Sequence, residues 1–317
     1  MHSAAIKRQA RARPTKAAAS SPSKRARVAA QTAARPKVLV SGAAGRTGKL
    51  VLKKLLEGRD GFDVRGLVRT EKSRQRLAKE VGSDVELVVG DVSDPASLKA
   101  AMSGCDKLVI LTSAKPQIMK RSIVFMMLRK VIGRQPGRPT FRWIDKGSPE
   151  EVDYLGGINQ VDAAKDAGLD QVVYVGSMGG TEKDNFLNTI GSPGPANILL
   201  WKRKAEEYLI KSGLNFTIIH LGGLLDKPGG KRNLIVDVDD KILKTKTRSV
   251  PRADVAAVVV ACLGFDKASN VSFDLASEDE QEADVPLDMS SLLGVLNGKS
   301  CDYSIGKEAV ESLVSSL

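Results

Sequence analysis

The sequence predicts an α/β fold in which a doubly wound, mostly parallel sheet is covered by helices on both faces. From Lys37 onward, short runs rich in Val, Leu and Ile alternate with helical stretches. Such runs, without polar alternation, are typical of strands buried on both faces. Strand–helix repetition at this spacing favours parallel pairing with right-handed crossovers. A chain of 317 residues has room for one large domain or two modest ones.

Each element follows from its apolar pattern, in chain order. Strands are expected at 37–41, 62–68, 85–89 and 107–112, separated by helices at 47–57, 71–80 and 95–102. The series resumes with a helix at 151–167, a strand at 171–176, a helix at 198–212 and a strand at 216–220. The remainder, about 221–317, is mixed and predicts a small C-terminal substrate lobe. It contains a Gly/Pro-rich stretch at 222–230, a helix from about 252, a strand near 272–275 and a helical last thirty residues.

The first 36 residues differ from the rest of the chain. They hold nine Lys and Arg residues and no acid, and the first acidic residue of the chain is Glu57. The net charge of +12 therefore falls to +3 for residues 37–317, which hold 40 basic and 37 acidic residues. A leader rich in Ala, Ser, Lys and Arg without an apolar core is typical of a transit peptide, the alternative being a basic tail that binds anionic surfaces. We expect a transit peptide over 1–36 and the folded domain over 37–317.

The composition disfavours several classes of protein. Cys105, Cys262 and Cys301 lie far apart, which speaks against a disulfide scaffold, a zinc ribbon or a CxxC redox centre. The chain has only two histidines, His2 and His220, so we expect no His-based metal cluster. No run of about 18 apolar residues predicts a membrane span. Nucleic-acid binding is disfavoured because the mature charge is small and only 4% of residues are aromatic.

A glycine-rich loop follows the first strand directly and opens the next helix. It reads Gly42, Ala43, Ala44, Gly45, Arg46, Thr47 and Gly48. The first glycine permits a tight turn, the second lets the backbone approach a pyrophosphate, and the third allows close packing of helix on strand. The amides at the helix N-terminus then face the phosphate oxygens. In this strand–loop–helix context the loop predicts a dinucleotide site in a Rossmann-type fold rather than a purely structural turn.

The end of the second strand indicates which dinucleotide binds. An NAD site usually presents Asp or Glu there to the ribose 2′-hydroxyl, whereas a 2′-phosphate requires Arg. Arg69 follows this strand and Arg46 lies in the loop, so we expect NADP(H) with both guanidinium groups on the phosphate; the alternative is two solvated surface arginines. After the third strand, Asp91 stands where the adenine edge is expected. A turn role for Asp91 or a helix-capping role for Asp94 is equally simple.

Several motifs between residues 37 and 276 together resemble a known family. They are the glycine loop, Gly90-Asp91-Val92, VGSMGG at 175–180, WKRKAE at 201–206, GGL at 222–224 and PRADVA at 251–256. The chain is similar to the atypical short-chain dehydrogenase/reductases, in particular to NmrA-like plant and algal plastid NAD(P)-binding Rossmann proteins. The resemblance implies one Rossmann domain with a small C-terminal lobe and a chloroplast location, in the stroma. Leader composition alone leaves a mitochondrial location open.

The resemblance also implies catalytic positions. Active members use Ser, Tyr and Lys, with the Tyr four positions before the Lys. Ser177 and Lys202 match, but Ile198 stands in the Tyr position, and isoleucine cannot transfer a proton. Tyr154 is the nearest alternative acid, or else an ordinary partly buried residue. Asp153 stands where many members carry Asn.

The stretch from 113 to 150 is too long for an ordinary strand–helix connection. Between 115 and 146 it carries nine basic residues and one acid, Asp145. The spacing of Met119, Ile123, Met126 and Lys130 indicates a short amphipathic helix. Because the insert leaves the carboxyl end of the fourth strand, we expect a lid over the cofactor or packing on its own domain. The alternative is docking on an anionic membrane or a protein partner through 115–146.

Together these features predict an NADP(H)-binding oxidoreductase of unknown substrate. Hydride transfer requires mainly position and polarity from the protein, so Ser177 and Lys202 can serve a reaction that takes its proton from water. The alternative is a non-catalytic redox sensor or assembly factor, favoured by Ile198 and the insert. His220, at a strand end, is expected to find a backbone partner rather than to act as a base.

Overall fold

The computed structural model describes residues 35–315 apart from 59–60, 83–84, 138, 145, 192–193 and 195. The predicted leader lies outside the described residues, except for Arg35 and Pro36. Both belong to the folded unit. The Pro36 carbonyl accepts a 3.1 Å hydrogen bond from the Asp63 amide, and the Arg35 guanidinium lies 3.0 Å from the Asp63 carboxylate. The domain therefore includes two residues that the sequence pattern assigns to the leader.

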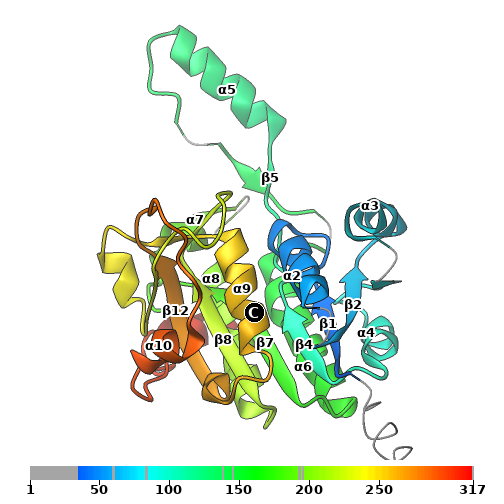
Figure 1. The fold of residues 1–317 in the computed structure, drawn as a ribbon. Coiled ribbons are helices and arrows are strands. Elements are labelled where there is room, and N and C mark those ends of the chain that lie inside the picture. The colour runs from blue at the N-terminus through cyan, green and yellow to red at the C-terminus, as the bar shows by residue number, and fades with distance from the viewer. Residues whose placement is uncertain are drawn as a thin grey trace, which may run out of the picture. The chain divides into compact units, whose positions relative to one another are not determined.

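A ten-stranded sheet forms the centre of this unit (Figure 1). Its strand order is β3-β2-β1-β4-β7-β8-β12-β11-β9, with β10 paired to β12. The first six strands in this order are parallel: β3 (Glu86–Val89), β2 (Asp63–Val68), β1 (Lys37–Ser41), β4 (Lys107–Ile110), β7 (Gln171–Ser177) and β8 (Phe216–Leu221). The chain runs outward from β1 to β3 and then crosses back to β4. Ligands bind at such a switch point, outside the carboxyl ends of the strands.

Residues after 221 extend the same sheet. Strand β12 (Val271–Ser277) pairs in parallel with β8 and antiparallel with β10 (Leu234–Asp237). Beyond β12, β11 (Ser249–Pro251) pairs with β9 (Gly223–Leu225). The described residues from Arg35 onward belong to one compact unit, so the mixed C-terminal part is continuous with the dinucleotide-type half.

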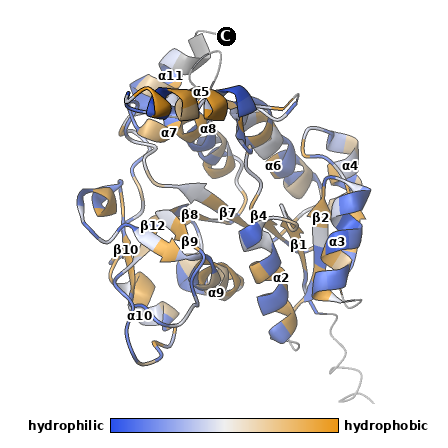
Figure 2. Ribbon diagram, turned by 90° about the horizontal axis from the view of Figure 1, so that it is seen from above, coloured by the Kyte–Doolittle hydropathy of each residue, from blue (hydrophilic) through white to orange (hydrophobic). Residues whose placement is uncertain are grey.

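Helices cover both faces of the sheet (Figure 2). Helices α2 (Arg46–Glu57) and α9 (Arg252–Cys262) pack together on one face, whereas α4 (Pro95–Met102), α6 (Gly156–Asp166) and α8 (Ile198–Lys211) cover the other. Side chains of β1 alternate between the two apolar cores: Val38 and Val40 enter one, and Leu39 enters the other. All three are fully buried. Burial on both faces explains why the central strands read as uninterrupted apolar runs.

The remaining helices differ partly from the expected pattern. Helix α3 (Glu71–Val81) lies as expected, but the expected helix 151–167 begins with a π-helical turn, η1 (Glu150–Leu155), before α6. Of the last thirty residues, the described ones, 288–315, contain two short helices, α10 (Met289–Gly294) and α11 (Lys307–Ser315). Short helical turns complete the fold: α7 (Phe186–Thr189), η2 (Lys241–Lys244) and η3 (Asp266–Ala268).

The insert forms a two-stranded ribbon with a helix at its end. Strands β5 (Gln117–Ile118) and β6 (Phe141–Arg142) pair antiparallel, and helix α5 (Lys120–Val131) lies between them in the chain. The expected short helix is therefore present, but none of its residues is buried. Packing of this helix on its own domain is not what the structure shows. Among the described residues, no helix combines the length and apolarity needed to cross a membrane.

Candidate nucleotide site

Two adjoining cavities open at the carboxyl ends of the parallel strands. The first, of about 310 Å³, lies among the loops that follow β1, β2, β3 and β4. The second, of about 400 Å³, extends from the glycine loop to the ends of β7 and β8. Gly45 and Leu111–Lys115 line both. The cavities thus form one trough that crosses the start of helix α2.

The glycine loop turns where the two cavities meet. Gly42 has φ +71°, and a Cβ there would lie 2.7 Å from the Leu111 carbonyl group. A Cβ on Gly48 would collide with the Gly42 carbonyl oxygen, because α2 starts directly on the loop. The residue that precedes α2 is Gly45, and no side chain caps the helix there. The first amides of α2 are therefore available to an anion in the trough.

Arg69 lines the first cavity at the end of β2, together with Thr70 and Ser73. Its side chain is exposed. The sequence-predicted cation thus stands beside the trough, at the strand end where dinucleotide sites distinguish a 2′-hydroxyl from a 2′-phosphate.

Asp91 also lines the first cavity. Its carboxylate accepts hydrogen bonds from the Ser93 amide at 3.0 Å and the Ser93 hydroxyl at 2.9 Å. Asp94 accepts the Ala96 amide at 3.0 Å and caps α4. Both simple roles are therefore present, the turn at Asp91 and the cap at Asp94. Contact of Asp91 with an adenine edge stays a prediction.

Arg46 lies at the second cavity, not the first. Its guanidinium contacts the Asp226 carboxylate at 2.8 Å, and the other oxygen of Asp226 lies 2.6 Å from Arg252 of α9. The Arg46 side chain is nevertheless 70% exposed. Asp226 thus links the glycine loop to the C-terminal half, and Arg46 has to leave this ion pair to reach a phosphate on the Arg69 side.

Lys202 on α8 lines the inner end of the second cavity and is buried. Its ammonium group lies 2.7 Å from the carboxylate of Asp153, which is also buried. The other oxygen of Asp153 accepts a 3.0 Å hydrogen bond from the Ala114 amide, in the segment that lines both cavities. The π-helical turn η1 carries Asp153. Sequence reasoning noted Asp153 only as a departure from Asn and missed this pairing.

Ser177 and Ile198 also line the second cavity, from the end of β7 and the start of α8. The Ser177 hydroxyl contacts the Met178 carbonyl at 3.3 Å. Tyr154 lines neither cavity. Its ring instead stacks on Trp201 with centroids 5.3 Å apart, and the Lys204 ammonium lies 4.1 Å from the ring centre. A proton-donating role for Tyr154 stays a prediction without geometric support.

The two ends of the insert line the trough, whereas the helix of the insert does not. Lys115, Pro116 and Trp143 line the second cavity, and Ile144 lines the first. No residue of α5, which is described throughout, lines either cavity. The lid expectation therefore applies to the segments that flank the β5–β6 ribbon.

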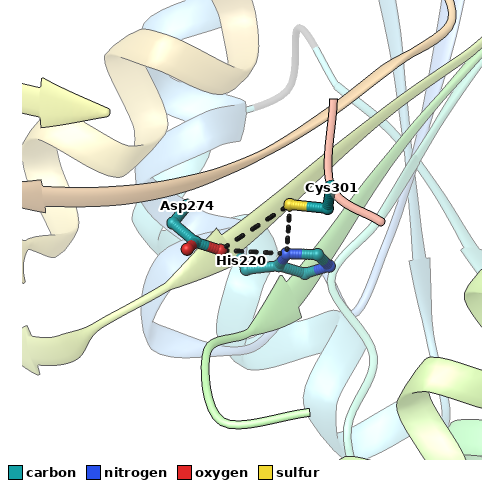
Figure 3. Close-up of side chains that lie close together, drawn as sticks. All are labelled: His220, Asp274 and Cys301. Carbon is teal, nitrogen blue, oxygen red and sulfur yellow. Dashed lines mark hydrogen bonds and ion pairs between the residues drawn. The ribbon is translucent and has the colours of Figure 1, made fainter. Parts of the chain in front are cut away.

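A buried polar cluster is centred on His220 (Figure 3), which shares the lining of a small cavity with Ser177. The imidazole Nδ1 lies 3.2 Å from the Asp274 carboxylate and 3.6 Å from Cys301 Sγ. Nε2 lies 3.1 Å from the Glu206 carboxylate and 3.3 Å from the Tyr303 hydroxyl. The expected backbone partner is thus replaced by side chains from α8, β12 and the C-terminal segment.

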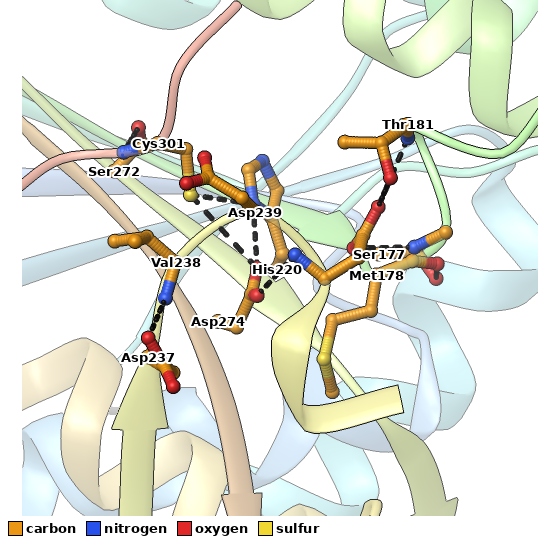
Figure 4. A network of polar contacts seen from close by, with 12 residues as sticks. Ser177, Met178, Thr181, His220, Asp237, Val238, Asp239, Ser272, Asp274 and Cys301 are labelled. Atoms are coloured by element: carbon orange, nitrogen blue, oxygen red, sulfur yellow. Dashed lines mark hydrogen bonds and ion pairs between the residues drawn. The ribbon is translucent and has the colours of Figure 1, made fainter. Parts of the chain in front are cut away.

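The cluster extends to the loop after β7 through a second carboxylate (Figure 4). The far oxygen of Asp274 accepts the Asp240 amide at 2.7 Å. Asp240 in turn accepts the Gly179 amide at 2.7 Å and the Thr181 amide and hydroxyl at 2.9 and 2.6 Å. His220 is therefore connected through hydrogen bonds to the loop that begins at Ser177.

His220 lies between two carboxylates, one facing each ring nitrogen. Burial alone would lower the pKa of His220, but the charge of Glu206 and the contacts with Tyr303, Asp274 and Cys301 raise it well above its ordinary value. Burial also raises the pKa of Asp274, an effect that His220 opposes. The ligand atoms of His220, Asp274 and Cys301 lie within 4.8 Å of one another. The contacts of this cluster join β8, α8, β12 and the C-terminal segment.

Comparisons with known proteins agree with this geometry. The family model described as NAD(P)H-binding matches residues 42–266. Over 246 residues the chain is 50% identical to "Uncharacterized protein At2g37660, chloroplastic" from Arabidopsis thaliana, covering 77% of this chain and 70% of the relative. It is 45% identical over 264 residues to sanguinarine reductase from Eschscholzia californica, covering 80% and 94%.

The fold is also found among solved structures. A short-chain dehydrogenase/reductase from Veillonella parvula in complex with NADP has a TM-score of 0.52 at 18% identity, covering 80% of this chain and 99% of that one. Its likeness concerns the fold, and the family match covers the glycine loop and the strands around the trough. The chain therefore belongs to the NAD(P)H-binding family and has a Rossmann fold, which fits the resemblance to atypical, NmrA-like short-chain dehydrogenase/reductases that its motifs indicate.

Proposed function

We propose that this protein is an NADPH-dependent reductase whose substrate accepts a hydride without a proton from the protein. The observation that carries the proposal is Ile198, which lines the second cavity together with Lys202 and Ser177. The resemblance to the short-chain dehydrogenase/reductases implies that the acid of active members, a tyrosine, would stand at the position of Ile198. Here the trough retains its binding groups and lacks an acidic side chain at that position.

Preference for NADPH is supported by Arg69. Its exposed guanidinium lies at the first cavity, and the cavity lining at the end of β2 includes Thr70 but no carboxylate. A guanidinium offers two parallel hydrogen bonds to a phosphate. Lys202, held by Asp153 at the inner end, would bond the ribose hydroxyls next to the nicotinamide. The amides at the start of α2 would hold the pyrophosphate.

The missing acid restricts the class of substrate. The bound dinucleotide supplies a hydride. An iminium cation that gains a hydride becomes a neutral amine, with no proton transferred. A quinone that gains a hydride needs one proton, which water at the open trough can give. An aldehyde or ketone needs its proton as the alkoxide develops, where a positioned acid contributes typically 10²–10⁴-fold.

The walls of the second cavity favour a planar apolar substrate. Trp143, Leu187, Ile190, Ile198 and Leu224 line it. Such walls bury aromatic surface well, and the polar side chains that share the cavity, Ser177 and Lys202 among them, can orient it. The name of the sanguinarine reductase relative supports a reductase of this general type. We therefore propose quinones and aromatic iminium compounds as the substrate class.

NADPH oxidation with three probes tests the proposal: a benzoquinone, an N-methylated aromatic iminium and an aromatic aldehyde. We expect turnover of at least one of the first two, and at least ~10-fold slower reduction of the aldehyde. The Ile198→Tyr variant should raise aldehyde reduction, because it returns a phenol to the position four residues before Lys202. Ile190→Tyr is the matched control, since it adds the same group elsewhere on the second cavity.

Two outcomes would overturn this function. NADPH binding without turnover of any probe would favour the alternative of a non-catalytic redox sensor or assembly factor. Equal rates with NADH and NADPH, unchanged in Arg69→Ala, would remove the proposed cofactor preference.

We also propose that the protein acts in the chloroplast stroma. The Arabidopsis relative is named as chloroplastic, and the basic, acid-free residues 1–36 have transit-peptide composition. The mitochondrial alternative has no comparable support among the relatives described above. Import of the full chain into isolated chloroplasts and mitochondria, followed by protease treatment and fractionation, tests both the organelle and the compartment.

A further inference from the structure

We propose that the insert docks on an anionic membrane surface through helix α5. The insert is taken as residues 115–146 and is called the arm below. This inference is independent of the proposed reductase activity, because no residue of α5 lines the trough. In Figure 1, α5 lies apart from the sheet, beyond β5.

The arm exposes an unusual amount of apolar surface. Val124, Phe125, Met127 and Val131 are 65%, 59%, 64% and 82% exposed. Ile123, Leu128 and Ile132 are exposed as well. Large apolar side chains that lie together on a surface mark an interaction site, whereas single ones need no explanation. Helix α5 therefore presents a surface that a partner has to cover.

The distribution of these side chains favours lipid over a protein groove. Residues 123–128 are all apolar, and at 100° per residue six consecutive positions point in every direction around a helix. A groove covers one stripe of a helix, at spacings of three and four residues. A fluid acyl layer can surround the apolar segment on several sides at once. The pattern thus fits immersion better than docking against one protein face.

Charge complementarity identifies the kind of membrane. The arm holds nine basic residues and one acid. Lys120 and Arg121 precede the apolar segment, and Arg129 and Lys130 follow it. Long basic side chains at both ends can lie along apolar surface and keep their charges at the level of the lipid headgroups. Anionic headgroups attract each such residue by about 1 kcal/mol near the surface.

Helix α5 is too short to span a membrane, so its contact with the membrane is limited to one surface. Helix α5 has 12 residues, whereas a membrane span needs about 20. Within the arm, the β5–β6 ribbon joins α5 to the carboxyl end of β4. The helix can therefore lie at the boundary between the headgroups and the acyl chains while the folded unit stays in water, as in peripheral membrane enzymes.

Vesicle flotation with the full chain tests the charge and apolar requirements. We expect flotation with phosphatidylcholine vesicles containing phosphatidylglycerol and none with phosphatidylcholine alone. Val124→Ser/Leu128→Ser and Arg129→Glu/Lys130→Glu should each reduce flotation at least tenfold. The controls are Val295→Ser, another exposed apolar residue, and Lys72→Glu/Lys79→Glu, which makes the same charge change on α3. Control variants that lose flotation equally would overturn the proposal.

A second measurement reads insertion at the arm itself, since the basic leader can also attract anionic vesicles. Phe125→Trp places an indole on α5, and Val295→Trp places one outside the arm, directly after α10. Brominated lipid should quench Phe125→Trp beyond the wild-type background and leave Val295→Trp unaffected. Equal quenching of the two variants would overturn the proposal.

Self-association is the competing occupant of this surface. Sedimentation velocity of the wild type and of Val124→Ser/Leu128→Ser decides between them. A dimer that dissociates in the variant, without lipid quenching of Phe125→Trp, would assign the surface to a second copy of the chain and refute membrane docking.

Discussion

The function of one half of the trough depends on backbone geometry, and that of the other half depends on single side chains. The glycine-loop half depends on backbone: left-handed φ at Gly42, contact of Gly48 with a carbonyl oxygen, and uncapped amides at the start of α2. The inner half depends on single side chains, namely Lys202 paired with Asp153, and Ile198. Binding geometry encoded in the backbone tolerates little change. A proton transfer that depends on one side chain is lost when that residue is replaced, whereas the backbone that holds the dinucleotide is unchanged.

The largest expected effect on cofactor binding comes from a substitution in the glycine-loop half. Gly48→Ala brings a Cβ onto the Gly42 carbonyl oxygen, so the loop has to shift away from the pyrophosphate position. We expect about a 100-fold loss of NADPH affinity, roughly 2.7 kcal/mol, by isothermal titration. Gly58→Ala is the control, because its Cβ would lie 3.9 Å from its nearest neighbour. Unchanged affinity in Gly48→Ala would show that the dinucleotide does not use this loop.

The next prediction separates the role of Lys202 in its ion pair with Asp153 from its role in cofactor binding. Lys202→Met leaves the Asp153 carboxylate buried without its cation, which costs about 3 kcal/mol of unfolding free energy. Lys202→Met/Asp153→Asn removes both charges and should recover most of that stability in urea titrations. Hydride transfer should remain impaired in both variants, because neither has the ammonium group. Wild-type stability in Lys202→Met would contradict the buried ion pair.

A smaller effect concerns the polar cluster that supports the inner half. The pKa of His220 is raised in the fold, facing Glu206, Asp274, Cys301 and Tyr303. Its stabilisation is therefore complete below its ordinary pKa of 6.5 and declines as pH rises toward the higher pKa of the folded state. The contribution of His220 should fall by up to ~1.4 kcal/mol per pH unit in that window.

Urea unfolding at pH 6 to 9 measures this dependence. His220→Gln should flatten the decline, whereas His2→Gln, at the other histidine of the chain, should reproduce the wild-type profile. A decline that persists in His220→Gln would assign the titration to another group.

The smallest expected effect is a change in NADPH affinity that tests the role of Arg46. Asp226→Asn weakens the ion pair that holds Arg46 at the second cavity, where the Arg46 side chain is mostly exposed and the pair is correspondingly weak. If Arg46 joins Arg69 on the 2′-phosphate, NADPH affinity should rise about two- to threefold, roughly 0.5 kcal/mol, with NADH affinity unchanged. An equal change for both dinucleotides would place Arg46 away from the phosphate.

Much of the dinucleotide-binding part of the fold could be predicted from the sequence. Strand 37–41 and helix 95–102 were expected at the bounds that the structure has, because buried parallel strands and short capped helices have strong local patterns. The short strands β9, β10 and β11 were not predicted, since their few residues lie at a mixed sheet edge. The π-helical turn at 150–155 carries no distinct sequence pattern.

The side-chain networks could not be predicted, because their members are distant in the sequence. Lys202 meets Asp153 across 49 positions, and His220 meets Cys301 across 81. Local patterns do not encode such meetings; only the sheet order brings them about. An acidic residue in place of Asn at 153 was a usable signal, because a buried carboxylate requires a cation nearby.

The wide turn η1 has a consequence for engineering this chain. A π-helical turn arises when one extra residue enters an α-helix, and here it carries Asp153 in a window of six residues, Glu150–Leu155. Deleting Leu155 would shorten the path from Asp153 to α6 by one residue and change the direction in which the Asp153 side chain points relative to α6. We expect the Asp153 carboxylate to lose its contact with the Lys202 ammonium group although both residues remain in the sequence. Substitution scanning would not detect this dependence, but a single-codon deletion would.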